Sequence, residues 1–110
     1  MAQHRAASGE VVDLSPLGSE NMAAEKTTAL VKTNAFEAVR LVMKAGAAIA
    51  THQVAGPITL HCLQGRVSVD TANGTFELTA GSWVYLEGST PHSLRAADDA
   101  SLLLTIIFVG

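Results

Sequence analysis

Residues 46–65, GAAIATHQVAGPITLHCLQG, decide the fold class of this chain. The stretch opens and closes on a glycine and lies between apolar, strand-like runs. It contains two of the four histidines, His52 and His61. A second stretch, residues 81–92 (GSWVYLEGSTPH), likewise runs from a glycine to a histidine, His92. We interpret the two stretches as segments that bring His52 and His92 together inside a small β-barrel.

Short runs with the period of two that is typical of β-strands follow one another along the chain. Residues 66–71 (RVSVDT) alternate, and the Asn-Gly at the following turn tolerates the positive φ of a tight hairpin. Residues 75–79 return as the partner strand. Further strands are expected at residues 27–33, 36–44, 58–63, 82–86, 92–96 and 102–109. A helix over residues 35–50 is the rival interpretation, and residues 19–29 are expected as a loop or a single helical turn. Eight or more short strands predict an all-β sandwich or jelly-roll barrel.

The composition indicates one soluble domain. The chain has 110 residues, of which 48% are hydrophobic, and a net charge of −3. No cluster of Lys and Arg is present for phosphate contacts, which argues against nucleic-acid binding. No apolar run approaches the ~20 residues that span a bilayer, and the N-terminus lacks the apolar core of a signal peptide. The single cysteine, Cys62, allows no intramolecular disulfide and is expected to be a buried small hydrophobe. A cytoplasmic protein is the resulting expectation.

The domain organisation follows from the change of pattern along the chain. Residues 1–18 are expected as an N-terminal tail with a short edge strand at residues 11–17, which Pro16 ends. Residues 19–110 are expected to form a single barrel domain.

The two glycine-to-histidine stretches resemble the two signature motifs of the cupin superfamily. The first motif has the pattern G-x5-H-x-H-x3,4-E-x6-G, and Gly46, His52 and Gly65 stand at matching positions. The second has the pattern G-x5-P-x-G-x2-H-x3-N, which Gly81 and His92 match. The resemblance covers more than half of the chain. It implies a small single-domain cupin of the RmlC-like type, with a double-stranded β-helix or jelly-roll barrel.

The same motifs depart from the family pattern at the metal ligands. The two histidines and the glutamate of the first motif and the histidine of the second are the usual ligands in cupins. Only His52 and His92 are present, because Val54 and Ile58 stand where the second histidine and the glutamate are expected. The resemblance therefore implies a degenerate site that holds a divalent transition metal (Zn, Fe, Ni or Mn) weakly.

A third ligand has two candidates, His61 and Gln53. If positions 52, 54 and 58 point inward, the even-numbered Leu60 and Cys62 follow them and His61 points out of the barrel. A bulge near residues 56–57 would reverse this direction. Both orientations of His61 remain open at this point.

Three further residues lie in the second stretch. Trp83 and Tyr85 share one face of a strand, where they either pack or stack on a ligand. Glu87 replaces the turn proline of the motif and is the one carboxylate expected near the pocket mouth.

Two functions from different classes fit these residues. The first is a binding module that holds a small polar molecule in the barrel through His52 and His92, and the loss of acid–base groups favours it. The alternative is a metal-dependent enzyme of the isomerase, lyase or dioxygenase type acting on a small organic acid or sugar. A homodimer is expected, because cupins are commonly dimers and the apolar content suits a buried sheet-to-sheet interface.

Overall fold

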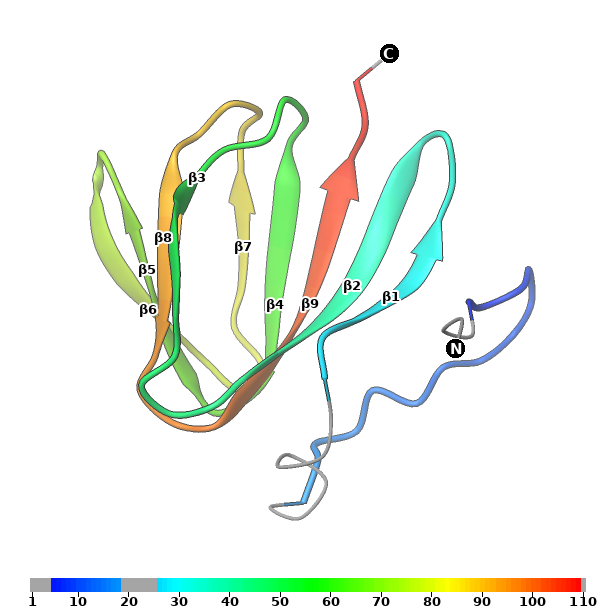
Figure 1. Cartoon of the computed structure of the whole chain (residues 1–110), viewed down its shortest axis with the longest axis horizontal. Helices are drawn as coiled ribbons and strands as arrows, with labels where there is room; N and C mark the ends of the chain where they lie inside the picture. Colours follow the sequence, from blue (N-terminus) through cyan, green and yellow to red (C-terminus); the bar gives the residue numbers. More distant parts are fainter. Residues whose placement is uncertain (1–4, 19–25, 110) are drawn as a thin grey trace.

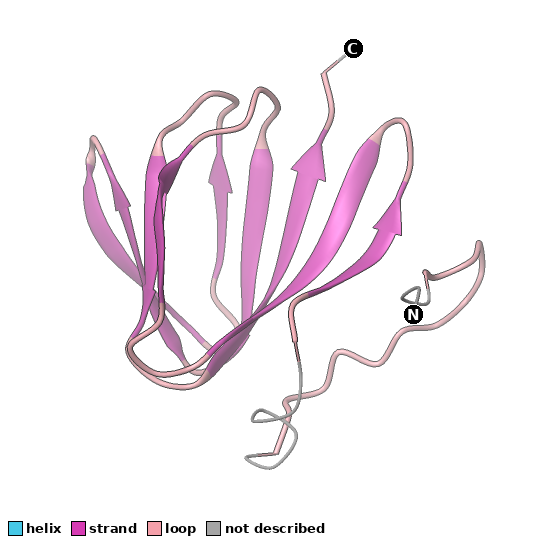
Figure 2. Ribbon diagram, viewed as in Figure 1, coloured by secondary structure: helices cyan, strands magenta, loops and turns pink. Residues whose placement is uncertain are grey.

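The computed structural model describes residues 5–18 and 26–109, and these form nine strands in two antiparallel sheets (Figures 1 and 2). Sheet A has the strand order β1-β2-β9-β4-β7, and sheet B has the order β3-β8-β5-β6. The strands are β1 (Thr28–Lys32), β2 (Phe36–Met43), β3 (Ala48–His52), β4 (Ile58–Gln64), β5 (Arg66–Thr71), β6 (Gly74–Thr79), β7 (Trp83–Leu86), β8 (His92–Ala96) and β9 (Ala100–Ile107). The prediction of an all-β jelly-roll barrel is confirmed.

The rival helix over residues 35–50 is wrong. Residues 36–43 pair with β9 in an unbroken antiparallel register from Phe36↔Ile107 to Met43↔Ala100. Alternating apolar side chains on this strand meet the barrel core on one side and the outer surface of sheet A on the other. Among the described residues, no helix is long and apolar enough to cross a membrane.

The core lies between the two sheets and is built from alternate positions of their strands. Cys62 is fully buried within it, as the sequence indicates. The buried apolar side chains are Leu41, Met43, Ile58, Leu60, Cys62, Val67, Val69, Leu78, Leu86, Leu94, Ala96, Ala100 and Leu102. A barrel filled in this way leaves little room inside it, so any interior site must be small.

The glycines that frame the two motifs have backbone reasons to be glycine. Gly46, Gly65 and Gly81 all have positive φ, at 87°, 81° and 92°. A Cβ on Gly65 would also lie 2.3 Å from the carbonyl oxygen of Asp99. Because L-residues rarely adopt this region of φ, these positions confine the turns that set the ends of the strands.

The N-terminal segment does not form the edge strand expected at residues 11–17. Its backbone is bound instead by a buried side chain of β2, since Arg40 donates from Nη2 to the Ser15 carbonyl at 2.8 Å and from Nη1 to the Asp13 carbonyl at 3.4 Å. Pro16 has no N–H to give to a strand ladder. Carbonyls that would pair with a neighbouring strand are therefore taken by a guanidinium.

A second anchor fixes the end of this segment to sheet A. The Gln64 amide bonds both backbone groups of Leu17, accepting its N–H at 2.6 Å and donating to its carbonyl at 2.8 Å. The buried Ser101 hydroxyl donates to the same Gln64 oxygen at 2.8 Å. Most of the loop or helical turn expected at residues 19–29 lies outside the described residues, which resume at residue 26.

Candidate functional site

The two motif histidines lie side by side in neighbouring strands of sheet B. His52 ends β3 and His92 begins β8, and the two are direct partners in the antiparallel register. Their ring centroids are 4.4 Å apart, with the ring planes tilted by 56°. His92 is buried at 4% exposure, whereas His52 is exposed. The pair therefore joins the barrel interior to its mouth, at the end of the barrel where β3 stops and β8 starts (Figure 1).

Backbone carbonyls set the tautomer of both rings. Nδ1 of His92 lies 2.8 Å from the Thr90 carbonyl oxygen, and Nδ1 of His52 lies 3.1 Å from that of Ala50. A carbonyl only accepts hydrogen bonds, so each Nδ1 carries the proton. In the neutral rings this leaves both Nε2 atoms as acceptors with free lone pairs. The pair thus presents two Lewis bases to whatever enters the barrel.

An apolar cavity adjoins the histidine pair. It has a volume of about 90 Å³, with a smaller continuation of about 30 Å³ that shares both histidines. Its remaining lining residues are Leu41, Ile49, Val54, Ile58, Leu60, Leu94, Leu104 and Ile106. The lining of the interior site is therefore apolar apart from the two histidine rings.

Val54 and Ile58 point into this cavity, as the motif alignment requires. Ile58 is 3% exposed and lines both parts of the cavity, and Val54 lines the smaller part. The positions where the family pattern has a histidine and a glutamate are thus at the site but carry aliphatic side chains. The first motif has kept its geometry but carries only one of its three expected ligands, His52.

This donor set does not fit a metal ion held by the protein. Catalytic zinc sites use three protein ligands and structural ones use four. Within the described residues, no group of three or more His, Cys, Asp or Glu side chains is placed to hold an ion. The Nδ1–H groups of both histidines are held by backbone carbonyls, as is usual for metal-binding histidines. The site nevertheless has one protein ligand fewer than a catalytic zinc site.

His61 lies on the other face of its strand and does not line the cavity. Its neighbours Leu60 and Cys62 are buried in the core, and its register partners are Trp83 and Leu103. The strand parity therefore holds, and the bulge that would turn His61 inward is absent from the segment 58–62. The expectation that His61 supplies a third metal ligand is corrected by this direction.

The other candidate residues also lie away from the pair. Gln53 is exposed and does not line the histidine cavity. Trp83 and Tyr85 are 61% and 51% exposed on the edge strand β7, so neither packs into the core. Tyr85 lines a separate cleft together with Glu87. Burial raises the pKa of the Cys62 thiol, which is held among core side chains and is not a reactive group.

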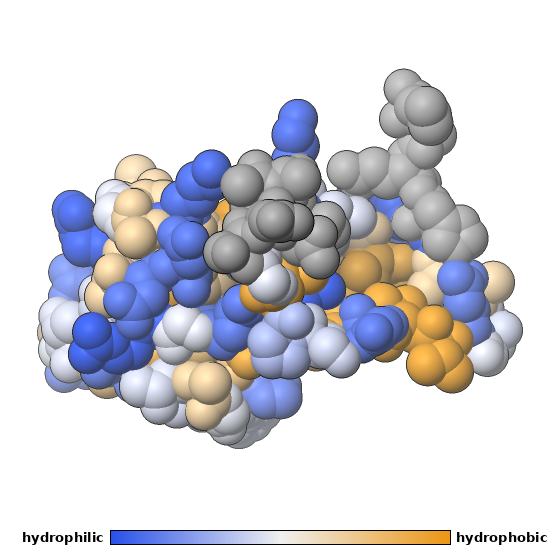
Figure 3. Space-filling model, turned by 90° about the horizontal axis from the view of Figure 1, so that it is seen from below, coloured by the Kyte–Doolittle hydropathy of each residue, from blue (hydrophilic) through white to orange (hydrophobic). Residues whose placement is uncertain are grey.

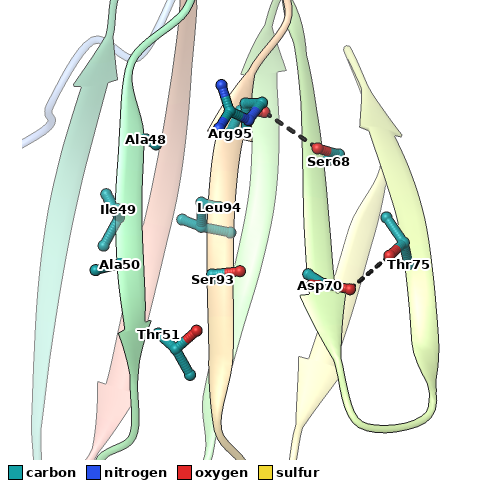
Figure 4. Close-up of a pocket in the computed structure, with 10 residues that line it drawn as sticks. All are labelled: Ala48, Ile49, Ala50, Thr51, Ser68, Asp70, Thr75, Ser93, Leu94 and Arg95. Carbon is teal, nitrogen blue, oxygen red and sulfur yellow. Dashed lines mark hydrogen bonds between the residues drawn. The ribbon is translucent and has the colours of Figure 1, made fainter.

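A larger hollow lies outside the barrel, on sheet B (Figure 4). It has a volume of about 500 Å³ and is lined by short side chains, with Arg95 and Asp70 as its charged residues. The sequence interpretation missed it, although outward positions of β5 and β8 carry polar side chains in alternation. Asp70 already accepts a hydrogen bond from Thr75 at 2.5 Å. The histidine cavity is smaller, but two histidine rings meet an apolar lining there, each with one ring nitrogen that makes no hydrogen bond within the described residues, which makes it the better candidate site.

Solved structures with the same architecture identify the fold. A cupin superfamily protein from Desulfitobacterium hafniense superposes with a TM-score of 0.75 over 90% of this chain and 95% of its own, at 11% sequence identity. The chain has the cupin fold. An RmlC-like cupin protein from Desulfovibrio desulfuricans superposes with a TM-score of 0.68 at 20% identity, over 97% of this chain and 96% of its own.

The structure of KdgF from a Halomonas species also superposes on the chain, with a TM-score of 0.65 and 21% identity over 74% of each chain. By sequence, no family model and no curated protein matches the chain. At these identities the likeness establishes the architecture, and the site must be argued from this chain's own residues.

Proposed function

We propose that the chain binds a compact molecule with hydrogen-bond donors inside the barrel, through Nε2 of His52 and Nε2 of His92. The observation that carries this proposal is the pair of Nδ1 contacts to the Ala50 and Thr90 carbonyls. They leave Nε2 of each ring as an acceptor, and both rings line an apolar cavity. A primary amide or an ammonium group has donors for both nitrogens and an alcohol has a donor for one of them, whereas a carboxylate brings no donor at neutral pH.

The size of the cavity limits the ligand. A water molecule occupies about 30 Å³ in the liquid, so 90 Å³ is the room of about three water molecules and holds a group of about three or four non-hydrogen atoms. Val54 and Ile58 line the same space. Their methyl groups favour a ligand with an apolar part and supply no acid or base for catalysis. Binding is therefore better supported than chemistry on the bound molecule.

The experiment is an NMR titration of the tag-free, ¹⁵N-labelled protein with three probes of equal heavy-atom count: isopropanol, isopropylamine and acetate. At neutral pH the alcohol and the amine are expected to shift the ring resonances of His52 and His92, and acetate is expected not to. The variants His52→Phe and His92→Phe should lose the response. His61→Phe is the matched control, because it removes the same ring from the outer face. An equal response to all three probes, or one that survives both variants, would contradict the proposal.

Metal content tests the alternative of a metal-dependent enzyme. Zn, Fe, Ni and Mn are quantified by mass spectrometry in the tag-free protein and in the His52→Ala and His92→Ala variants. Metal well below one equivalent is expected, because two ligands bind divalent ions weakly. One equivalent that disappears in both variants would favour the metal-dependent alternative over the binding module.

We also propose that the chain forms a homodimer through the β2 and β9 part of the outer face of sheet A. The outward positions of these two strands carry one charged residue, Arg40, which is buried under the N-terminal segment. Ile107 on this part of the face is 40% exposed. In Figure 3 the end of the molecule with sheet B is mostly hydrophilic, and hydrophobic surface gathers toward the β1 and β2 end. Sedimentation equilibrium should show a dimer that Ile107→Glu dissociates, and a monomer at all concentrations would refute this interface.

A further inference from the structure

A second cleft lies where the free edge of β7 faces the turn between β5 and β6. It has a volume of about 400 Å³, which is within the range of small-molecule sites. β7 pairs only with β4, so its other edge is open. Figure 1 shows the end of β7 and the β5–β6 turn at the same end of the barrel as the β7–β8 loop. We call this site the edge cleft.

The edge cleft combines an aromatic side with polar groups that are free to bind. Tyr85 is 51% exposed and Phe76 is half-buried, and both line the cleft. Glu87, Asn73 and Thr90 line it as well. Among the described residues, none of the Tyr85, Glu87, Asn73 and Thr90 side chains makes a hydrogen bond or ion pair within the chain. A ligand therefore meets these groups without breaking an internal contact.

We propose that the edge cleft binds a neutral sugar ring. The C–H face of a pyranose stacks on an exposed aromatic ring such as Tyr85, because that face is apolar and polarised toward a π-system. Its hydroxyls donate to the Glu87 carboxylate and exchange hydrogen bonds with the Asn73 amide and the Thr90 hydroxyl. Of the cavities and clefts described above, the edge cleft is the one whose lining combines an exposed aromatic ring with a carboxylate that makes no hydrogen bond within the described part of the chain.

The charge in the cleft determines which sugars fit. Glu87 is the one acidic or basic residue among the lining residues. A carboxylate opposite an acidic sugar repels it and leaves two anions partly desolvated. Neutral sugars are therefore favoured over uronic acids, and an amino sugar is favoured further because its ammonium pairs with Glu87.

The edge cleft is separate from the histidine cavity but includes a residue whose backbone holds the His92 ring. Thr90 lines the edge cleft, and its carbonyl accepts the Nδ1–H of His92 at 2.8 Å. Thr71 also lines the cleft and is the register partner of His92 across β5 and β8. A sugar in the edge cleft is thus expected to shift the His92 ring resonances slightly, while the His92→Phe variant keeps sugar binding. That difference separates the failure of this proposal from the failure of the proposed function.

The test is an NMR titration with methyl β-glucopyranoside, glucosamine and glucuronate as probes. The glucoside should give saturable shifts centred on Tyr85, Glu87 and Asn73, with glucosamine tighter and glucuronate at least about fivefold weaker. Tyr85→Ala should weaken the glucoside by at least about fivefold, and Tyr85→Phe should retain it, because stacking needs only the ring. Trp83→Ala is the matched control, since it removes the other exposed aromatic residue of β7.

Glu87→Gln tests the role of the carboxylate charge. The affinity for glucuronate should rise close to that for the glucoside, and circular dichroism should show an unchanged fold. Absence of saturable shifts up to about 100 mM glucoside would overturn the proposal. So would an unchanged affinity in Tyr85→Ala, or equal binding of glucoside and glucuronate by the unmodified chain.

Discussion

Replacing Ile58 by glutamate tests the geometry of the interior site most directly. Ile58 is 3% exposed and lines both parts of the cavity beside His52 and His92. The Ile58→Glu change removes about 2–3 kcal/mol of apolar burial. It also places a carboxyl group in an apolar site, which adds about 1–3 kcal/mol when its hydrogen bonds are incomplete. We expect a total loss of about 3–6 kcal/mol, a large share of the roughly 5–15 kcal/mol of a typical domain.

Zinc should recover part of this loss, because the variant has a third ligand beside the two Nε2 atoms. A metal that binds only the folded state raises the free energy of unfolding by about 2.7 kcal/mol when the free metal concentration is 100 times its Kd. The assay is urea unfolding with EDTA and with zinc. Zinc should raise the midpoint of Ile58→Glu and leave the unmodified chain almost unchanged.

The control is Thr59→Glu, one residue along the same strand. Thr59 pairs with Tyr85 and Thr105 and lies on the outer face of sheet A. The change should cost less than about 1 kcal/mol and give no response to zinc. Equal destabilisation of both variants, or zinc stabilising Thr59→Glu as much as Ile58→Glu, would refute the inward direction of position 58.

Three further results follow from local features of the fold. Ser89 has a φ of 60° at a position where the motif has glycine. In chemical denaturation, Ser89→Gly should raise the free energy of unfolding by about 0.5 kcal/mol and Ser89→Val should lower it by more than about 1 kcal/mol. A valine variant more stable than the unmodified chain would contradict this. Gln64→Ala should cost about 1–3 kcal/mol and expose the segment before Leu17 to limited proteolysis, since it removes both bonds to that residue; unchanged cleavage would show that the anchor is dispensable. Burial raises the pKa of the Cys62 thiol, so the native chain binds more thiol protons than the unfolded chain at alkaline pH. Stability should therefore fall as pH rises above the unfolded pKa, and Cys62→Ala should flatten this slope in pH-dependent unfolding.

The strand pattern was predictable because it depends on neighbours in the chain. Residues 66–71 and 92–96 were expected as strands and are β5 and β8 with the same bounds. Alternation of apolar and polar side chains is a local property, and so is the turn preference of Asn-Gly. The edge strand at residues 11–17 failed for a non-local reason: Arg40 in β2 takes its carbonyls.

The direction of the His61 side chain also depended on non-local contacts. The sequence offered two orientations, which differed by a single bulge in the loop before β4. The core contacts of Leu60 and Cys62 decide between them, because a register shifted by one residue would place both of these side chains in solvent. The edge cleft was not foreseeable from the sequence, since Tyr85 and Asn73 line one cleft only because the fold places β7 next to the β5–β6 turn.

The sequence by itself determined the barrel class, the two glycine-framed motifs and the loss of two of the four expected ligands to Val54 and Ile58. These depend on residue type and spacing along one chain. Only the tertiary structure decided that the rings of His52 and His92 lie 4.4 Å apart with both Nε2 atoms free. The physical reason is that ring contact and tautomer depend on strand register and on two backbone carbonyls, which no spacing in the sequence encodes.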